Sequence, residues 1–172
     1  RATGSSDVMV AGQHYATVGK CMHIWEGEPE CVYVPLSTEV TFTCVSETAE
    51  IFISGAKHDQ VYTPFVVREA DIDPVQYGSD DTKTHRKIKH ILGKAQAGKV
   101  GRLLVSELFT VGAGGWSGFP PHKHDTDTLP TESRHDEVYN FRFNPEHGFG
   151  AQFITQEGED MGDGKLALRQ TQ

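Results

Sequence analysis

The stretch Cys31-Val-Tyr-Val-Pro-Leu36 combines β-branched and aromatic side chains and is bounded by polar residues. Such runs are typical of short β-strands, because these side chains pack well on a pleated surface. Runs of the same texture recur along the chain, at residues 39–45, 51–54, 61–67, 101–111, 137–143 and 149–155. Short strands that are spread over the whole chain and separated by turn residues predict an all-β fold, either a sandwich or a barrel.

One segment, residues 84–92, has a weak helical pattern. Ile88 and Ile91 are three positions apart, as on one face of a helix, but Gly93 follows directly. The segment could equally be an exposed strand that carries basic side chains, and a solvated strand face is the preferred interpretation. Arg86 within it could bind an anionic group, because a guanidinium contacts a carboxylate through two hydrogen bonds.

Two zones interrupt the strand pattern. Residues 69–84 are rich in Asp and Gly, which predicts a connection and places a soft domain boundary there. Residues 112–136 form a long loop region, and long loops within compact domains often carry function. The second zone is therefore the place to look for chemistry.

Composition and charge limit the classes of partner. The 172 residues include 16 Lys and Arg against 24 Asp and Glu, for a formal net charge of −8. Without a basic surface, nucleic acids and membrane surfaces are not expected partners. The sequence has no apolar run of about 18 residues and no apolar signal core at its start, so we predict a cytoplasmic protein. Cys21, Cys31 and Cys44 form no CxxC pair and are interpreted as reduced, structural thiols.

The second zone contains the pair His122-Lys-His124, and Glu137 opens the next apolar run. Residues i and i+2 of an extended backbone point to the same side, so both imidazoles can bind one ion. Glu137 can supply a third ligand once the intervening loop folds back. A histidine and carboxylate set without thiolate favours zinc, manganese, iron or nickel in an open catalytic site. An isolated HxH can also be a surface pair, but the glycines and prolines of residues 114–121 favour ligands.

Neighbouring side chains have alternative roles. Glu132 and His135 could each replace Glu137 as the third ligand, and Asp125 is interpreted as a residue that supports the loop or a ligand. Arg134 and Arg142 compete with Arg86 for the recognition of an anionic group. Further histidines lie apart and are interpreted as surface or packing residues: His14, His23, His58, His85 and His90.

A longer pattern surrounds the histidine pair. Residues 114–125 read Gly-Gly-Trp-Ser-Gly-Phe-Pro-Pro-His-Lys-His-Asp, and Leu-Pro-Thr-Glu-Ser, Glu-Val-Tyr-Asn-Phe-Arg-Phe-Asn-Pro and Gly-Phe-Gly-Ala-Gln follow by residue 152. This pattern resembles the 5-deoxy-glucuronate isomerase family of myo-inositol catabolism and, more remotely, the 5-keto-4-deoxyuronate isomerase of pectin breakdown. The first half agrees more loosely, through Trp-Glu-Gly-Glu-Pro-Glu-Cys-Val-Tyr-Val-Pro at residues 25–35. The resemblance covers most of the chain.

The resemblance implies an all-β fold of two cupin domains, which are jelly-roll-like β-barrels, each of them incomplete in this chain. Residues 1–75 would be part of the first barrel, residues 76–99 a connection, and residues 100–172 the second barrel without its closing strands. The metal ligands of the family fall on His122, His124 and Glu137. The fourth ligand of the family, a histidine in the closing strands, is expected beyond Gln172.

The resemblance also implies a metal-dependent aldose–ketose isomerase that converts 5-deoxy-glucuronate to 5-dehydro-2-deoxy-gluconate. Its partner would be a small anionic sugar acid, and self-association into a homo-oligomer stays open. Proton transfer could fall to Glu132, His135 or Tyr139, and the substrate carboxylate could be bound by Arg142 and Lys123. The alternatives are a non-catalytic cupin that binds a sugar or a metal, and a cupin dioxygenase that uses the same ligands with iron.

Overall fold

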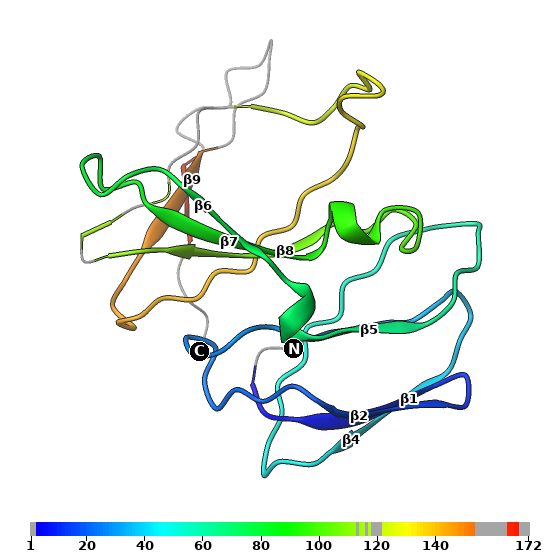
Figure 1. Cartoon of the computed structure of the whole chain (residues 1–172). Helices are drawn as coiled ribbons and strands as arrows, with labels where there is room; N and C mark the ends of the chain where they lie inside the picture. The colour runs from blue at the N-terminus through cyan, green and yellow to red at the C-terminus, as the bar shows by residue number, and fades with distance from the viewer. Residues whose placement is uncertain (1–2, 113, 116, 118–121, 154–164, 169–172) are drawn as a thin grey trace. The chain divides into compact units, whose positions relative to one another are not determined.

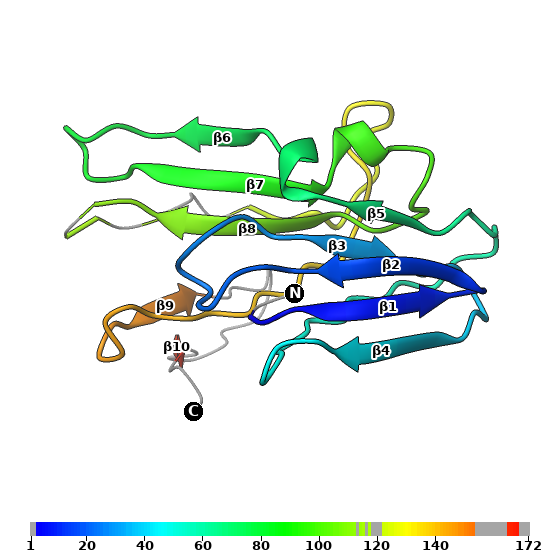
Figure 2. The same cartoon turned by 60° about the horizontal axis from the view of Figure 1, so that its bottom comes forward.

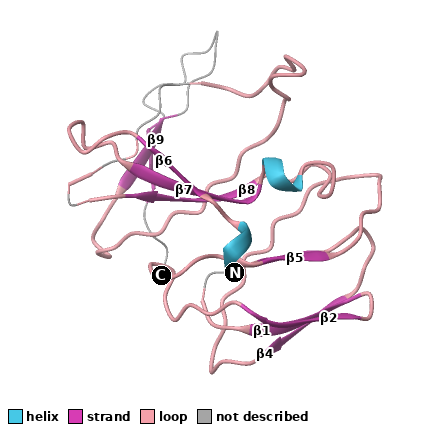
Figure 3. Ribbon diagram, in the orientation of Figure 1, coloured by secondary structure: helices cyan, strands magenta, loops and turns pink. Residues whose placement is uncertain are grey.

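The computed structural model describes residues 3–112, 114–115, 117, 122–153 and 165–168. The chain divides into two compact units, Arg1–Phe119, called the N-terminal unit below, and Pro120–Gln172, called the C-terminal unit. Within the described residues the regular elements are mainly strands, joined by long loops, and helix is confined to short 3-10 turns (Figure 3). The predicted all-β class is therefore confirmed. None of the helical turns in these ranges has the length and apolar character that crossing a membrane requires.

The first sheet of the N-terminal unit has the strand order β2-β1-β4 (Figures 1 and 2). β1 (Ser6–Val10) pairs antiparallel with both β2 (Gln13–Val18) and β4 (Val40–Cys44). Ala11 and Gly12 connect β1 to β2 with φ angles of 49° and 80°, the two left-handed positions of a type I′ turn. The sequence pattern did not predict β1 and β2, because Ala-Gly is a weaker hairpin signal than Asn-Gly or Asp-Gly.

A two-stranded sheet lies between two hydrophobic cores. β3 (Cys31–Tyr33) pairs antiparallel with β5 (Phe65–Val67). One face packs on a core from the first sheet, which consists of Val8, Val10, Tyr15 and Val18. The other face contributes to a second core, which consists of Tyr33, Val67, Ile72, Ile91, Leu92 and Val100. Burial of both faces explains why these strands read as continuous apolar runs, since successive side chains point to opposite sides.

The third sheet of the N-terminal unit has the order β6-β7-β8 (Figure 2). It consists of β6 (Pro74–Tyr77), β7 (Arg86–Leu92) and β8 (Val105–Thr110), all paired antiparallel. The segment with the weak helical pattern is thus the central strand of a sheet. Gly78 begins the turn between β6 and β7 with a φ of +75°, and a Cβ there would lie 2.2 Å from the carbonyl oxygen of Thr84. That turn therefore requires glycine.

The two segments expected as connections contain regular structure. Residues 69–84 include the 3-10 turn Glu69–Asp71 and β6, and residues 76–99 include β7 and the 3-10 turn Lys94–Gln96. β7 supplies Ile91 and Leu92 to the core that it shares with β3 and β5. The assignment of residues 1–75 and 100–172 to two barrels stays a prediction.

Two of the predicted strands form no ladder with another described strand. These are residues 51–54 and 137–143, which the structure leaves as loop. Ile53 and Val138 are 83% and 95% exposed, so no layer covers these apolar residues within the described chain. β-branched composition favours an extended backbone, but a strand also needs a neighbour to pair with.

The predicted strand at residues 149–155 is confirmed over its centre. β9 (Gly150–Phe153) pairs antiparallel with β10 (Lys165–Leu168) in the C-terminal unit. Residues 154–155 of the predicted strand lie outside the described residues.

One basic residue of β7 is buried, which corrects the expectation of a solvated strand face. Lys89 is 4% exposed. Its Nζ lies 2.8 Å from Oε2 of Glu28, 3.1 Å from the carbonyl oxygen of Gly27 and 4.8 Å from the centre of the Phe109 ring. Lys87, two residues earlier, lies 3.4 Å from Oε1 of Glu28. Burial opposes the charged form of Glu28, but both lysines outweigh it and hold the pKa of Glu28 below its ordinary value of 4.5.

We predict that Lys89→Met lowers the free energy of unfolding by about 1.5 to 3 kcal/mol, because it removes a charged hydrogen bond and leaves Glu28 partly buried without it. Lys87→Met is the matched control on the same strand and should cost less than about 1 kcal/mol, because the Lys87 side chain is 37% exposed whereas that of Lys89 is 5% exposed. Since the pKa of Glu28 is lowered, the difference should be complete above about pH 4.5 and disappear as the pH falls below it. Urea unfolding of the two variants at several pH values measures this, and equal losses would contradict it.

We also predict an order of thiol reactivity. Burial raises the pKa of the Cys31 thiol, so less thiolate is present at about pH 8 than in an ordinary thiol. Cys44 is exposed, and its thiol donates a hydrogen bond to the carbonyl oxygen of Ser46. Iodoacetamide followed by peptide mass spectrometry should label Cys44 first and Cys31 last, and unfolding should remove the difference. Equal rates in the folded protein would show that Cys31 is not protected.

Candidate metal centre

A closed loop in the C-terminal unit connects the histidine pair to Glu137. The backbone N–H of His135 donates to the carbonyl oxygen of His124 at 3.0 Å, which joins the two ends of the loop. At its tip, the N–H groups of Thr128 and Glu132 donate to the carbonyl oxygens of each other's residues at 3.0 and 3.3 Å. The N–H of Arg134 donates to Oδ1 of Asp127 at 2.7 Å. These bonds fold the loop back, as a third ligand from Glu137 requires.

His122, His124 and Glu137 come together as the sequence predicts. Each offers one ligand atom, and these atoms all lie within 4.8 Å of one another. Nε2 of His124 lies 4.0 Å from Oε1 of Glu137. Metal bonds of about 2.0 to 2.2 Å place the ligand atoms roughly 3 to 4 Å apart, so a contraction of about 1 Å completes the geometry. Two imidazoles and a carboxylate that converge in this way fit a divalent metal ion.

The second ring nitrogen of His124 is also engaged. Its Nδ1 lies 2.5 Å from Oε1 of Glu132. A carboxylate oxygen accepts, so Nδ1 carries the hydrogen and Nε2 carries the lone pair in the neutral ring. Nε2 is the nitrogen nearest Glu137, and in the tautomer with the hydrogen on Nδ1 it carries the lone pair that can bind an ion there.

Glu137 has a partner of its own. The hydroxyl of Tyr139 donates to Oε1 of Glu137 at 3.2 Å. Burial raises the pKa of Tyr139, and the charge and hydrogen bond of Glu137 act in the same direction. The hydroxyl therefore stays protonated at neutral pH and remains a donor to Oε1, the same oxygen that lies 4.0 Å from Nε2 of His124.

His135 lies against the ligand pair. Its ring stacks on that of His124 with a centroid distance of 4.1 Å and an angle of 25°. Its Nδ1 lies 2.8 Å from the carbonyl oxygen of Ser133, which only accepts, so Nδ1 carries the hydrogen. Nε2 of His135 is then free to accept a proton. The rings of His122 and His124 meet edge to face at 5.1 Å, so three imidazoles form one cluster.

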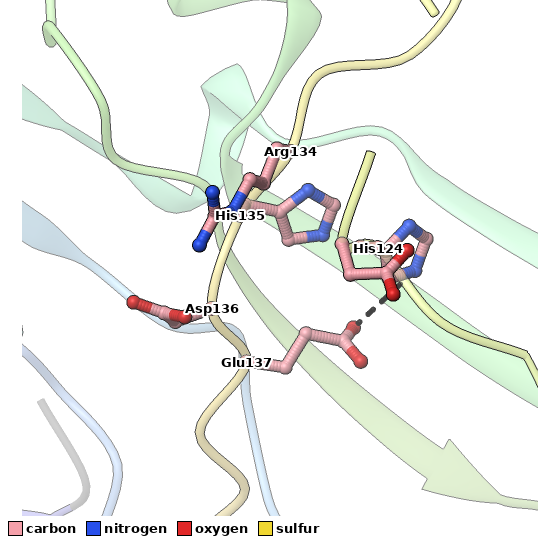
Figure 4. A pocket seen from close by; sticks show the side chains of 6 residues that line it. His124, Arg134, His135, Asp136 and Glu137 are labelled. Carbon is pink, nitrogen blue, oxygen red and sulfur yellow. Dashed lines mark ion pairs between the residues drawn. The ribbon is translucent and has the colours of Figure 1, made fainter. Parts of the chain in front are cut away.

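An open pocket of about 320 Å³ adjoins the cluster and is lined by His124, Asp125, Arg134, His135, Asp136 and Glu137. Figure 4 shows His135 and Glu137 on the side of the chain that faces His124, while Arg134 and Asp136 project to the other side. This alternation follows from the extended backbone of residues 134–137. Arg134 lines the pocket without facing the metal ligands.

Of the cations predicted to recognise an anionic group, Arg134 lines the pocket, whereas Lys123, Arg142 and Arg86 lie outside its lining. Nζ of Lys123 lies 3.1 Å from Oδ2 of Asp125, and its hydrogen bond to that carboxyl, with one from Thr126, lowers the pKa of Asp125. Arg142 is partly buried, and its role stays a prediction. Arg86 belongs to the N-terminal unit, where its guanidinium lies 6.0 Å from the centre of the Tyr77 ring.

One contact of the site was not predicted from the sequence, and one predicted feature lies outside the described residues. The contact of Glu132 with Nδ1 of His124 was not predicted, because an eight-residue separation across a folded loop has no periodic signal. The prolines at 120–121, expected to stiffen the entry to the histidine pair, lie outside the described residues, as do Trp116 and Gly118 before them.

Fold and cluster together define an all-β protein with a histidine and carboxylate site of the kind that metalloenzymes use. The family model described as the KduI/IolB family matches residues 1–171. The chain belongs to the KduI/IolB family.

Relatives of this chain carry the name 5-deoxy-glucuronate isomerase. The protein from Geobacillus kaustophilus is 30% identical and the one from Geobacillus thermodenitrificans 31% identical, each over 152 residues that make up 88% of this chain and 53% of the relative. The chain thus spans about half the length of these relatives. The crystal structure of an IolB-like protein from Salmonella typhimurium matches 98% of this chain and 62% of its own, with a TM-score of 0.72 and 24% identity. That likeness shows the fold.

We predict that the purified protein binds about one divalent ion per chain and that His124→Ala removes most of it, because one of three protein ligands is lost. His147→Ala is the control, since His147 is an exposed histidine of the same unit. Metal analysis after dialysis measures the occupancy, and circular dichroism checks that the β fold is kept. An unchanged metal content in His124→Ala would show that the cluster is structural.

Proposed function

We propose that this chain carries the metal site of an aldose–ketose isomerase that converts 5-deoxy-glucuronate to 5-dehydro-2-deoxy-gluconate in inositol catabolism. The observation that carries the proposal is the convergence of His122, His124 and Glu137 within 4.8 Å in a member of the KduI/IolB family. The names of the relatives support the substrate. The site contains imidazole and carboxylate groups and no thiolate, which supports zinc, manganese, iron or nickel.

The reaction needs no second substrate. A base removes the proton from the carbon next to the aldehyde, the electron pair of that C–H bond forms a C=C bond, and the π pair of the aldehyde moves onto its oxygen to give an enediolate. The base returns its proton to the former aldehyde carbon, and the proton of the neighbouring hydroxyl moves to the former aldehyde oxygen, which gives a ketone beside a primary alcohol. Atoms and electrons balance within one molecule. A bound divalent ion would act as a Lewis acid toward the negative charge that develops on the substrate oxygens.

His135 is the proton carrier that the geometry supports best. Glu132 is engaged by His124, and the hydroxyl of Tyr139 donates to Glu137. His135 lines the pocket with its Nδ1 held by Ser133, so its Nε2 can take a proton from one carbon and return it to the next. In this proposal Tyr139 orients Glu137, and His122 shares the ion with His124.

The carboxylate of the sugar acid requires a cation. Lys123 is the residue between the two histidine ligands, and Arg142 follows Glu137 by five positions. We assign them to this role because both lie in the same unit as the cluster. Release of Lys123 from Asp125 would be part of substrate binding, since the two now form an exposed pair.

The proposal also covers the domain arrangement, the location and the partners of the enzyme. Residues 1–75 and 100–172 would belong to two cupin barrels that residues 76–99 join. The enzyme would act in the cytoplasm on a small anionic sugar acid, without nucleic acid or membrane as a partner, and a homo-oligomer is one assembly open to it.

We predict that the full chain, loaded with metal, isomerises 5-deoxy-glucuronate without oxygen. His135→Asn should lower kcat by about 10²- to 10⁴-fold and leave metal binding intact, because it removes the proton carrier and no ligand. Product formation under nitrogen, followed by chromatography, measures both. Turnover that needs oxygen would support the dioxygenase, and metal binding without any turnover would support a non-catalytic cupin.

A further inference from the structure

We propose that Glu132 is a positioning residue for the metal site: its carboxylate holds His124 in the Nδ1–H tautomer and aims Nε2 at the ion. The inference rests on the proposed metal site and assigns a role to a residue that is not itself one of the converging ligands.

The two nitrogens of the His124 ring face two different carboxylates. Nδ1 of His124 faces Oε1 of Glu132 at 2.5 Å, and Nε2 of the same ring faces Oε1 of Glu137 at 4.0 Å. The two carboxylates therefore lie at opposite nitrogens of one imidazole. Only the nitrogen without hydrogen can bind a metal, so the partner at Nδ1 decides whether Nε2 is available. A neutral histidine side chain in water prefers the hydrogen on Nε2, which is the wrong tautomer for this site.

Backbone hydrogen bonds of the loop fix the position of Glu132. Its backbone is paired with Thr128 in both directions, and Oγ1 of Thr131 donates to the carbonyl oxygen of Thr128 at 2.6 Å. The N–H of His135 then ties the end of this loop to His124 itself. A loop closed by backbone hydrogen bonds thus places Glu132 beside His124.

The contact between Glu132 and His124 lies close to solvent. The side chain of Glu132 is 43% exposed and that of His124 is 24% exposed. A contact this close to solvent contributes little to folding, so its main effect falls on the orientation and tautomer of the ring. Removal of Glu132 should therefore leave the fold and weaken the binding of metal.

The experiment compares Glu132→Ala, which removes the acceptor, with Glu132→Gln, which keeps an acceptor oxygen without the charge. Glu146→Gln is the control, because Glu146 is an exposed carboxylate of the same unit. Zinc affinity is measured in the full chain by competition with a chelating dye. The tautomer of His124 is read in the metal-free protein from two-bond ¹H–¹⁵N correlations, and circular dichroism checks the fold.

We expect the zinc dissociation constant to rise about 10- to 100-fold in Glu132→Ala and less in Glu132→Gln. The Nδ1–H pattern of His124 should be present in the wild type and in Glu146→Gln, and lost in Glu132→Ala. An Nε2–H pattern in the wild type, or unchanged affinity and tautomer in Glu132→Ala, would overturn the role of Glu132 while leaving the metal site in place. Equal and complete loss of zinc in both Glu132 variants would make Glu132 a ligand instead. A wild-type protein that binds no zinc or other divalent ion would remove the metal site itself.

Discussion

The imidazole of His124 is the constraint on which the site depends. One of its nitrogens is held by Glu132 and the other faces Glu137, while the ring of His135 stacks on it and the ring of His122 meets its edge. A single side chain thus connects the ligands, the support of the ligands and the candidate proton carrier. Any change that turns this ring would disturb all three, because each contact uses a different part of it.

The loop from Asp125 to Arg134 makes this arrangement available. Its backbone bonds bring Glu132 back beside His124 and set the start of the segment that carries His135 and Glu137. The extended backbone then places these two side chains on one side of the chain and Arg134 and Asp136 on the other (Figure 4). The proposed proton carrier and the candidate ligand Glu137 therefore share one face of the chain.

The sequence predicts the fold class and the metal triad for different reasons. Runs of β-branched and aromatic residues identify β3 and β5, which are covered by a core on both sides. A strand that is buried on both faces is apolar at every position, so its composition is enough to predict it. Composition fails at residues 51–54 and 137–143, where no described strand pairs with an apolar run, and at β1 and β2, where an Ala-Gly turn closes the hairpin. It also fails at Lys89, since the burial of a lysine depends on Glu28 and Phe109, which lie far from it in the sequence.

The same distinction holds within the site. His122 and His124 share a side by their two-residue spacing, and Glu137 is predicted because it opens the next apolar run, in agreement with the ligand that the family resemblance implies. The role of Glu132 depends on the path of a loop, which no spacing rule describes. The sequence could not show which cation faces the candidate ligands, because nearness in sequence does not determine the direction of a side chain. Arg134, for example, is near the candidate ligands in sequence but projects away from them (Figure 4).

The most direct test is a crystal structure of the full chain soaked with a divalent metal, with diffraction data on both sides of the absorption edge of that metal. The account predicts one anomalous peak, about 2.0 to 2.2 Å from Nε2 of His124, a nitrogen of His122 and a carboxylate oxygen of Glu137, with Nδ1 of His124 still on Glu132. A peak bound through Nδ1 of His124, or a metal held elsewhere on the chain while these three side chains stay apart, would contradict it.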